Sequence, residues 1–170
     1  MKRYVFLKKD RVIAKLKEKL VPCVGANEEL EKLAKSGKYE LAVVSSSAHR
    51  RVMASLEKAG QAQWFPSERV FSAATSLAKP TSKPDPAIYL HACKTLGVEP
   101  KNSIAVEDSK SGSLSAIKAG IPVIAYVGSY ETPEKRQEIA KALKELGAEV
   151  VMNDWTEFES CVQAIESKHS

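Results

Sequence analysis

The sequence lacks any long apolar run. No stretch approaches the ~20 residues that a membrane-spanning helix needs, and the apolar stretch near the N-terminus is too short for a signal peptide. We therefore expect a soluble, cytoplasmic protein with no membrane partner. Its 170 residues, 44% of them hydrophobic, suffice for one domain with a real core.

Cysteine and histidine are also scarce. The three cysteines are far apart and none forms a Cys-x-x-Cys pair, so we expect reduced thiols rather than disulfides. The three histidines are equally scattered, which argues against a histidine metal centre. These six residues are Cys23, Cys93, Cys161, His49, His91 and His169.

The net charge of +5 is concentrated at the N-terminus. Residues 1–20 carry eight Lys or Arg and two acids, so the other 150 residues sum to about −1. Apolar residues over 5–20 recur at helical spacing, which predicts an amphipathic helix. A bound polyanion would explain the charge, but a solvated helix face is the simpler explanation. Nucleic acid is not an expected partner, because no aromatic residues are interleaved on the basic face.

Strands alternate with helices from residue 40 onwards. Strands are predicted at 40–44, 69–72, 103–106, 122–126 and 148–152. Helices are predicted at 27–36, 48–59, 87–96, 111–119, 133–146 and 157–167. This alternation is typical of an α/β fold, a three-layer, Rossmann-like parallel sheet.

The first predicted strand ends in three serines, Ser45-Ser46-Ser47. Ligands of parallel sheets bind beyond the carboxyl ends of the strands. A hydroxyl from Ser45 and a backbone N–H from Ser46 could hold a phosphate oxygen there. The alternative is that a serine simply caps the next helix.

A lysine, Lys83, lies in the proline-rich segment 82–86. Its neighbours limit its freedom, and an ammonium near a phosphate would offset negative charge during a reaction. The alternative is an ordinary solvated loop lysine.

Two acids, Glu107 and Asp108, end the strand at 103–106. Carboxylates at the end of an apolar strand are costly unless they bind a cation or a helix N-terminus. Oxygen ligands of this kind suit Mg²⁺, which takes few protein ligands and keeps its waters. The alternative is that Asp108 caps the following helix.

The order of these segments resembles the haloacid dehalogenase (HAD) superfamily, in its β-phosphoglucomutase-like phosphatase branch. The resemblance rests on Ser-Lys-Pro-Asp-Pro-x-Ile-Tyr at 82–89 and Val-Glu-Asp-Ser-x-x-Gly at 106–112, and it covers about residues 21–155. It implies a HAD-like core over 21–170 and a remnant of the family's helical cap over 1–20.

The resemblance also implies a chemistry. It points to an Mg²⁺-dependent phosphatase for small phosphorylated metabolites such as sugar or polyol phosphates. Lys83 would act in catalysis and bind phosphate together with Ser45 and Ser46, while Glu107 and Asp108 would bind the metal.

One motif of the family is missing. The nucleophile pattern Asp-x-Asp-x-Thr/Val occurs nowhere in the chain, and covalent catalysis needs such a nucleophile. Asp10 is not expected to replace it, because it falls in the predicted amphipathic helix rather than after an apolar strand. Asp154, which follows the last strand, is no better placed.

The missing motif belongs to the central strand of the family's sheet, so we expect that strand to be absent. The gap would expose unpaired backbone groups, which a second copy could cover as a homodimer. We expect this chain to be inactive alone, as a truncated enzyme, an artificial fragment or a pseudoenzyme. The alternative is a non-catalytic module that binds a phosphorylated ligand or another protein.

Overall fold

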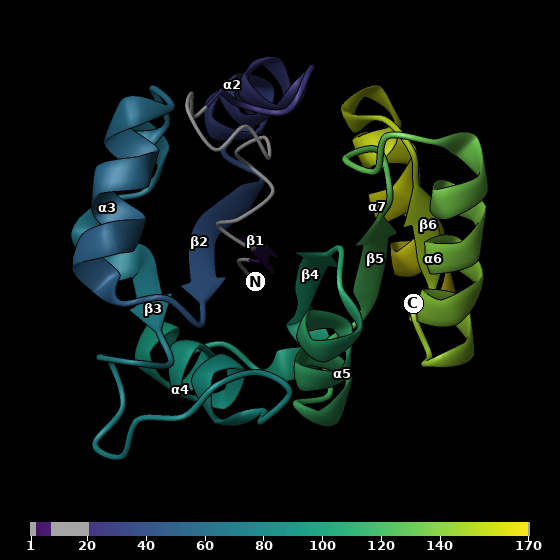
Figure 1. The fold of residues 1–170 in the computed structure, drawn as a ribbon. Coiled ribbons are helices and arrows are strands. Elements are labelled where there is room, and N and C mark those ends of the chain that lie inside the picture. Colours follow the sequence, from purple (N-terminus) through teal and green to yellow (C-terminus); the bar gives the residue numbers. More distant parts are fainter. Residues whose placement is uncertain (1–2, 8–20, 170) are drawn as a thin grey trace.

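A computed structural model describes residues 3–7 and 21–169. It is a three-layer α/β structure, a parallel six-stranded sheet between two layers of helices, as the sequence predicts (Figure 1). The strands are β1 (Arg3–Leu7), β2 (Tyr39–Ser45), β3 (Val70–Ser72), β4 (Ser103–Glu107), β5 (Val123–Tyr126) and β6 (Val150–Met152). The helices are α2 (Ala26–Ser36), α3 (His49–Lys58), α4 (Ala87–Leu96), α5 (Lys110–Lys118), α6 (Pro133–Glu145) and α7 (Phe158–Lys168).

The central strand of the sheet is present, contrary to the prediction from sequence. The strand order is β3-β2-β1-β4-β5-β6. β1 pairs in parallel with β2, where Leu7 lies opposite Val43, and with β4, where Leu7 lies opposite Val106. The expected gap between β2 and β4 therefore does not exist, and it offers no reason for a homodimer through exposed sheet.

The helix predicted over residues 5–20 is wrong at its start, because Val5, Phe6 and Leu7 lie in β1. All three are almost completely buried. A central parallel strand is covered on both faces and is therefore apolar throughout, and so short a run does not distinguish a strand from a helix. The rest of the predicted helix, and the cap assigned to it, lie outside the described residues.

The two faces of the sheet carry separate cores. Side chains such as Val5, Leu7 and Val43 pack against α2, α3 and α7, whereas Phe6, Ala42 and others pack against α4, α5 and α6. The three cysteines are buried and form no disulfide, as expected. None of the helices within residues 3–7 and 21–169 is long and apolar enough to cross a membrane.

Candidate functional site

The predicted site residues come from the ends of β2 and β4 and from the loops that follow β2, β3 and β4. β2 ends at Ser45, β4 ends at Glu107, and β1 ends between them at Leu7. Because all strands are parallel, these ends share one edge of the sheet, which is the edge where ligands of such sheets bind.

Lys83 links these strand ends. Its backbone N–H donates to Ser46 Oγ (3.2 Å), and its Nζ donates to the carbonyl oxygen of Val44 (3.1 Å). The same ammonium forms an ion pair with Glu107 Oε1. The side chains of Lys83 and Glu107 are only 2% and 0% exposed, so Lys83 is not a solvated loop lysine.

Tyr89 completes this buried cluster. Its hydroxyl donates to Glu107 Oε1 (2.6 Å), and its ring makes an edge contact with Phe6 of β1, with ring centroids 5.6 Å apart. Burial raises the pKa of the Tyr89 hydroxyl well above its ordinary value, and the nearby Glu107 carboxylate adds to this shift. Tyr89 therefore stays protonated and donates to Glu107. The sequence motif contains Tyr89, but it does not show that Tyr89 contacts Glu107.

The serines after β2 are not helix caps. α3 begins after Ala48, which makes no side-chain capping bond. Ser45 is buried, and its Oγ accepts from the backbone N–H of Ser47 (3.1 Å). Ser46 is exposed at the edge of the sheet, where its hydroxyl and backbone can meet a ligand.

Asp108 is not a helix cap either. The cap of α5 is Ser109, whose Oγ accepts from the backbone N–H of Gly112 (3.2 Å). Asp108 is nonetheless 1% exposed. The cost of burying a carboxylate there is thus not explained by helix capping.

The two acids suit a magnesium ion in their chemistry, because both offer carboxylate oxygens. Glu107 Oε2 is buried and has no hydrogen-bond partner within residues 3–7 and 21–169. This oxygen packs directly against Gly112, where a Cβ would lie only 1.9 Å away, so only glycine leaves room for the Glu107 carboxylate itself. No group of three or more potential metal ligands occurs in the described part of the chain. Mg²⁺ commonly uses only one or two carboxylates and completes its shell with water and phosphate.

Gly112→Ala should destabilise the fold. The added Cβ would overlap the Glu107 carboxylate, which Lys83 and Tyr89 hold in place. We expect a loss of about 1–3 kcal/mol in the free energy of unfolding, measured by urea denaturation. Lys118→Ala, at an exposed position of the same helix, is the control and should change little. An unchanged midpoint for Gly112→Ala would show that Glu107 moves aside easily.

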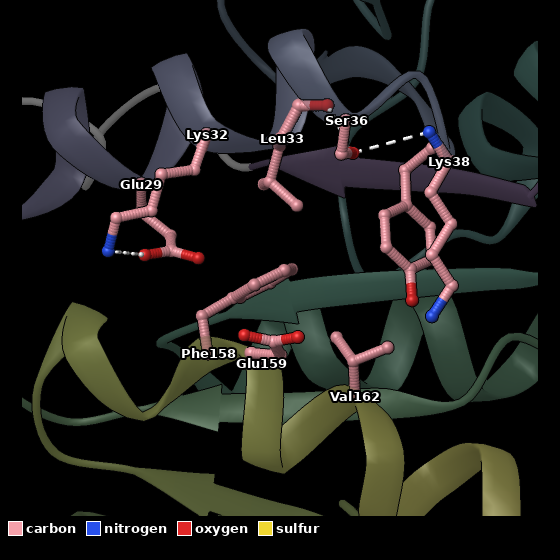
Figure 2. Close-up of a pocket in the computed structure, with 9 residues that line it drawn as sticks. Glu29, Lys32, Leu33, Ser36, Lys38, Phe158, Glu159 and Val162 are labelled. Atoms are coloured by element: carbon pink, nitrogen blue, oxygen red, sulfur yellow. Dashed lines mark hydrogen bonds and ion pairs between the residues drawn. The ribbon is translucent and has the colours of Figure 1, made fainter.

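A separate cavity of about 120 Å³ opens between α2 and α7. Figure 2 shows Leu33 and Ser36 of α2 on one side and Phe158 and Val162 of α7 on the other. None of the residues predicted from the motifs lines it. This cavity is therefore distinct from the cluster at the carboxyl edge of the sheet.

Fold and cluster together define a class, a parallel α/β protein with hydroxyl, lysine and acidic groups gathered at the carboxyl edge. The model of the haloacid dehalogenase-like hydrolase family matches residues 4–126. The chain therefore belongs to that family. The match begins within β1, which supports the assignment of this strand to the family's core.

Known relatives agree. The chain is 31% identical over 128 residues to hexitol phosphatase A of Escherichia coli, covering 75% of this chain and 56% of that protein. It is 34% identical over 120 residues to a phosphorylated carbohydrates phosphatase of Thermotoga maritima, covering 71% of this chain and 51% of the relative. It spans between 30% and 56% of the length of the curated relatives that it matches.

A solved structure matches as well. A HAD family hydrolase from Deinococcus radiodurans, with bound phosphate and sodium, superimposes with a TM-score of 0.73 at 26% identity. The match covers 86% of this chain and 61% of that protein.

Proposed function

We propose that this chain carries the phosphate and magnesium site of a sugar- or polyol-phosphate phosphatase and binds such ligands without turning them over. The observation that carries the proposal is the buried Lys83–Glu107 pair at the carboxyl edge, tied to Ser46 by the backbone of Lys83. A pair of this kind is costly to bury and has no obvious use in a purely structural loop.

Each residue has a defined part in the proposal. Ser45 supplies a hydroxyl and Ser46 a backbone N–H to a phosphate oxygen, and the ammonium of Lys83 offsets the negative charge that gathers there. Asp108 and Glu107 supply oxygen ligands to Mg²⁺. When bound, the metal would offset the charge on a phosphoryl oxygen.

The substrate class follows from the relatives. Hexitol phosphatase A and the phosphorylated carbohydrates phosphatase are named for phosphorylated polyols and sugars. Because the chain spans only about half of each of these relatives, their activity is extended to this protein as a proposal.

The nucleophile is lost by a substitution rather than by loss of the strand. β1 ends at Leu7, and the sequence continues Lys8-Lys9-Asp10-Arg11-Val12. This stretch matches the pattern Asp-x-Asp-x-Val except at its first position, which is lysine. A lysine cannot form the aspartyl-phosphate that the family's chemistry requires, so we expect binding without hydrolysis. Asp10 thus follows an apolar strand by three residues, contrary to the expectation from sequence.

Two measurements on the purified chain test this function. Hydrolysis of p-nitrophenyl phosphate with Mg²⁺ should be undetectable. Titration with inorganic phosphate and Mg²⁺, followed by calorimetry, should show binding that Asp108→Asn weakens about tenfold or more, because a ligand charge is removed without a change of shape.

Opposite results separate the two halves of the proposal. Turnover by the parent chain that Asp108→Asn abolishes would reveal another nucleophile and refute the loss of activity. Absence of Mg²⁺-dependent phosphate binding by a folded chain would refute the site itself. The alternative function is a non-catalytic module that binds a phosphorylated ligand. It would be supported if a Lys8→Asp variant, which restores the aspartate of the motif, still bound phosphate but did not hydrolyse p-nitrophenyl phosphate.

A further inference from the structure

We infer that Tyr130 is a positioning residue for Asp108, and that Arg136 holds Tyr130 in place. This inference rests on the proposed magnesium site. Neither residue belongs to the motifs from which the site is predicted. Tyr130 lies in the loop between β5 and α6, and Arg136 lies in the first turns of α6.

The contact between the loop and the site is direct. The Tyr130 hydroxyl donates a hydrogen bond to the backbone carbonyl oxygen of Asp108 (2.8 Å). The next residue, Ser109, caps α5 by accepting from Gly112. The loop therefore holds the Asp108 carbonyl, while the helix cap holds the next residue, Ser109. The position of this carbonyl limits where the Asp108 Cβ can lie, and so restricts the directions that its carboxylate can take.

The loop itself is fixed from two further elements. Arg136 donates from Nε to the carbonyl oxygen of Tyr130 (2.7 Å) and from Nη2 to that of Gly128 (3.3 Å). Gly128 lies so close to the end of β6 that a Cβ would come within 2.1 Å of the carbonyl oxygen of Asn153. Only glycine permits this approach.

A loop braced in this way has a use beyond stability. A metal ligand must be held in the productive geometry by surrounding hydrogen bonds, and losing such a partner weakens metal affinity. The chain of contacts from Arg136 through Tyr130 to Asp108 is a support of this kind. It predicts that the hydroxyl of Tyr130 tunes the affinity for Mg²⁺ although it is not a metal ligand.

The test compares the parent chain with Tyr130→Phe, which removes one oxygen atom and keeps the ring. Calorimetric titration with Mg²⁺ should show about a 3- to 10-fold weaker affinity, the cost of one hydrogen bond. Hydrogen–deuterium exchange should become faster over residues 108–113 and stay unchanged in α7. Arg136→Gln should act in the same direction, because it releases the loop that presents Tyr130.

Tyr39→Phe is the matched control. Its hydroxyl also donates a hydrogen bond, here to the carboxylate oxygen Glu166 Oε1 (3.1 Å), and it lies at the amino end of β2, away from the site. It should leave the Mg²⁺ affinity unchanged. Equal affinity in Tyr130→Phe and the parent, or an equal loss in Tyr39→Phe, would overturn the inference.

Failure of the underlying site looks different. If the parent chain binds Mg²⁺ no better than Asp108→Asn, the proposed metal site is wrong and Tyr130 has nothing to position. If the parent binds Mg²⁺ and Tyr130→Phe binds it equally well, the site stands and only the role of Tyr130 is refuted.

Discussion

Lys8→Asp should turn the chain into a phosphatase. The substitution completes the pattern Asp-x-Asp-x-Val in the sequence directly after β1, which ends at Leu7 between the strands that end at Ser45 and Glu107. A carboxylate nucleophile is absent from the sequence motif at this position. We expect Mg²⁺-dependent hydrolysis of p-nitrophenyl phosphate to rise at least about 10³-fold above the parent, since loss of a nucleophile typically costs that much or more.

Two controls separate a nucleophile from a change of charge. Lys9→Asp makes the same change in net charge one residue later and does not complete the pattern, so it should stay inactive. Lys8→Asn removes the lysine without providing a carboxylate and should also stay inactive. Activity in Lys9→Asp, or none in a folded Lys8→Asp chain that binds phosphate, would contradict the assignment of position 8 to the nucleophile. In the second case the binding-module alternative is favoured.

Lys83→Met should cost about 3–5 kcal/mol of the free energy of unfolding. Methionine has a similar length, so little packing is lost, but the Glu107 carboxylate stays buried without its cation. Breaking a buried ion pair from one side is costly for this reason. Chemical denaturation of the parent and the variant, compared at one temperature, measures the difference.

The double variant Lys83→Met/Glu107→Gln should recover most of that loss, because it leaves no unpaired charge and keeps an acceptor for the Tyr89 hydroxyl. Lys101→Met is the exposed control. Its ion pair with Glu99 (3.0 Å) has side chains that are 75% and 63% exposed, so its removal should cost less than about 1 kcal/mol. A loss below about 1 kcal/mol for Lys83→Met would show that water or another cation reaches Glu107.

Local sequence signals were sufficient for elements whose pattern fits only one kind of secondary structure. The alternation of apolar runs with helix signals from residue 40 gave the parallel strands β2 to β6 and the helices α3 to α7, and helix-start and helix-end signals gave α2. Thr132 followed by Pro133 predicted the start of α6, and Thr132 Oγ1 indeed accepts from the backbone N–H of Lys135 (3.2 Å). The order of the motifs gave the family and the edge of the sheet at which Ser46, Lys83 and Glu107 meet.

Tertiary structure decided what local signals left open. Val5, Phe6 and Leu7 are compatible with both a helix face and a buried strand. They form a strand because β1 fits between β2 and β4, where its backbone groups hydrogen-bond to both neighbours. The partners of Glu107 and Asp108 were equally hidden. Tyr89 and Tyr130 are 18 and 22 residues away along the chain, and hydrogen bonds over such separations depend on how helices and loops pack. The sequence by itself thus determined the fold class and the motif residues, whereas the completed sheet and the side chains that hold the site follow from packing alone.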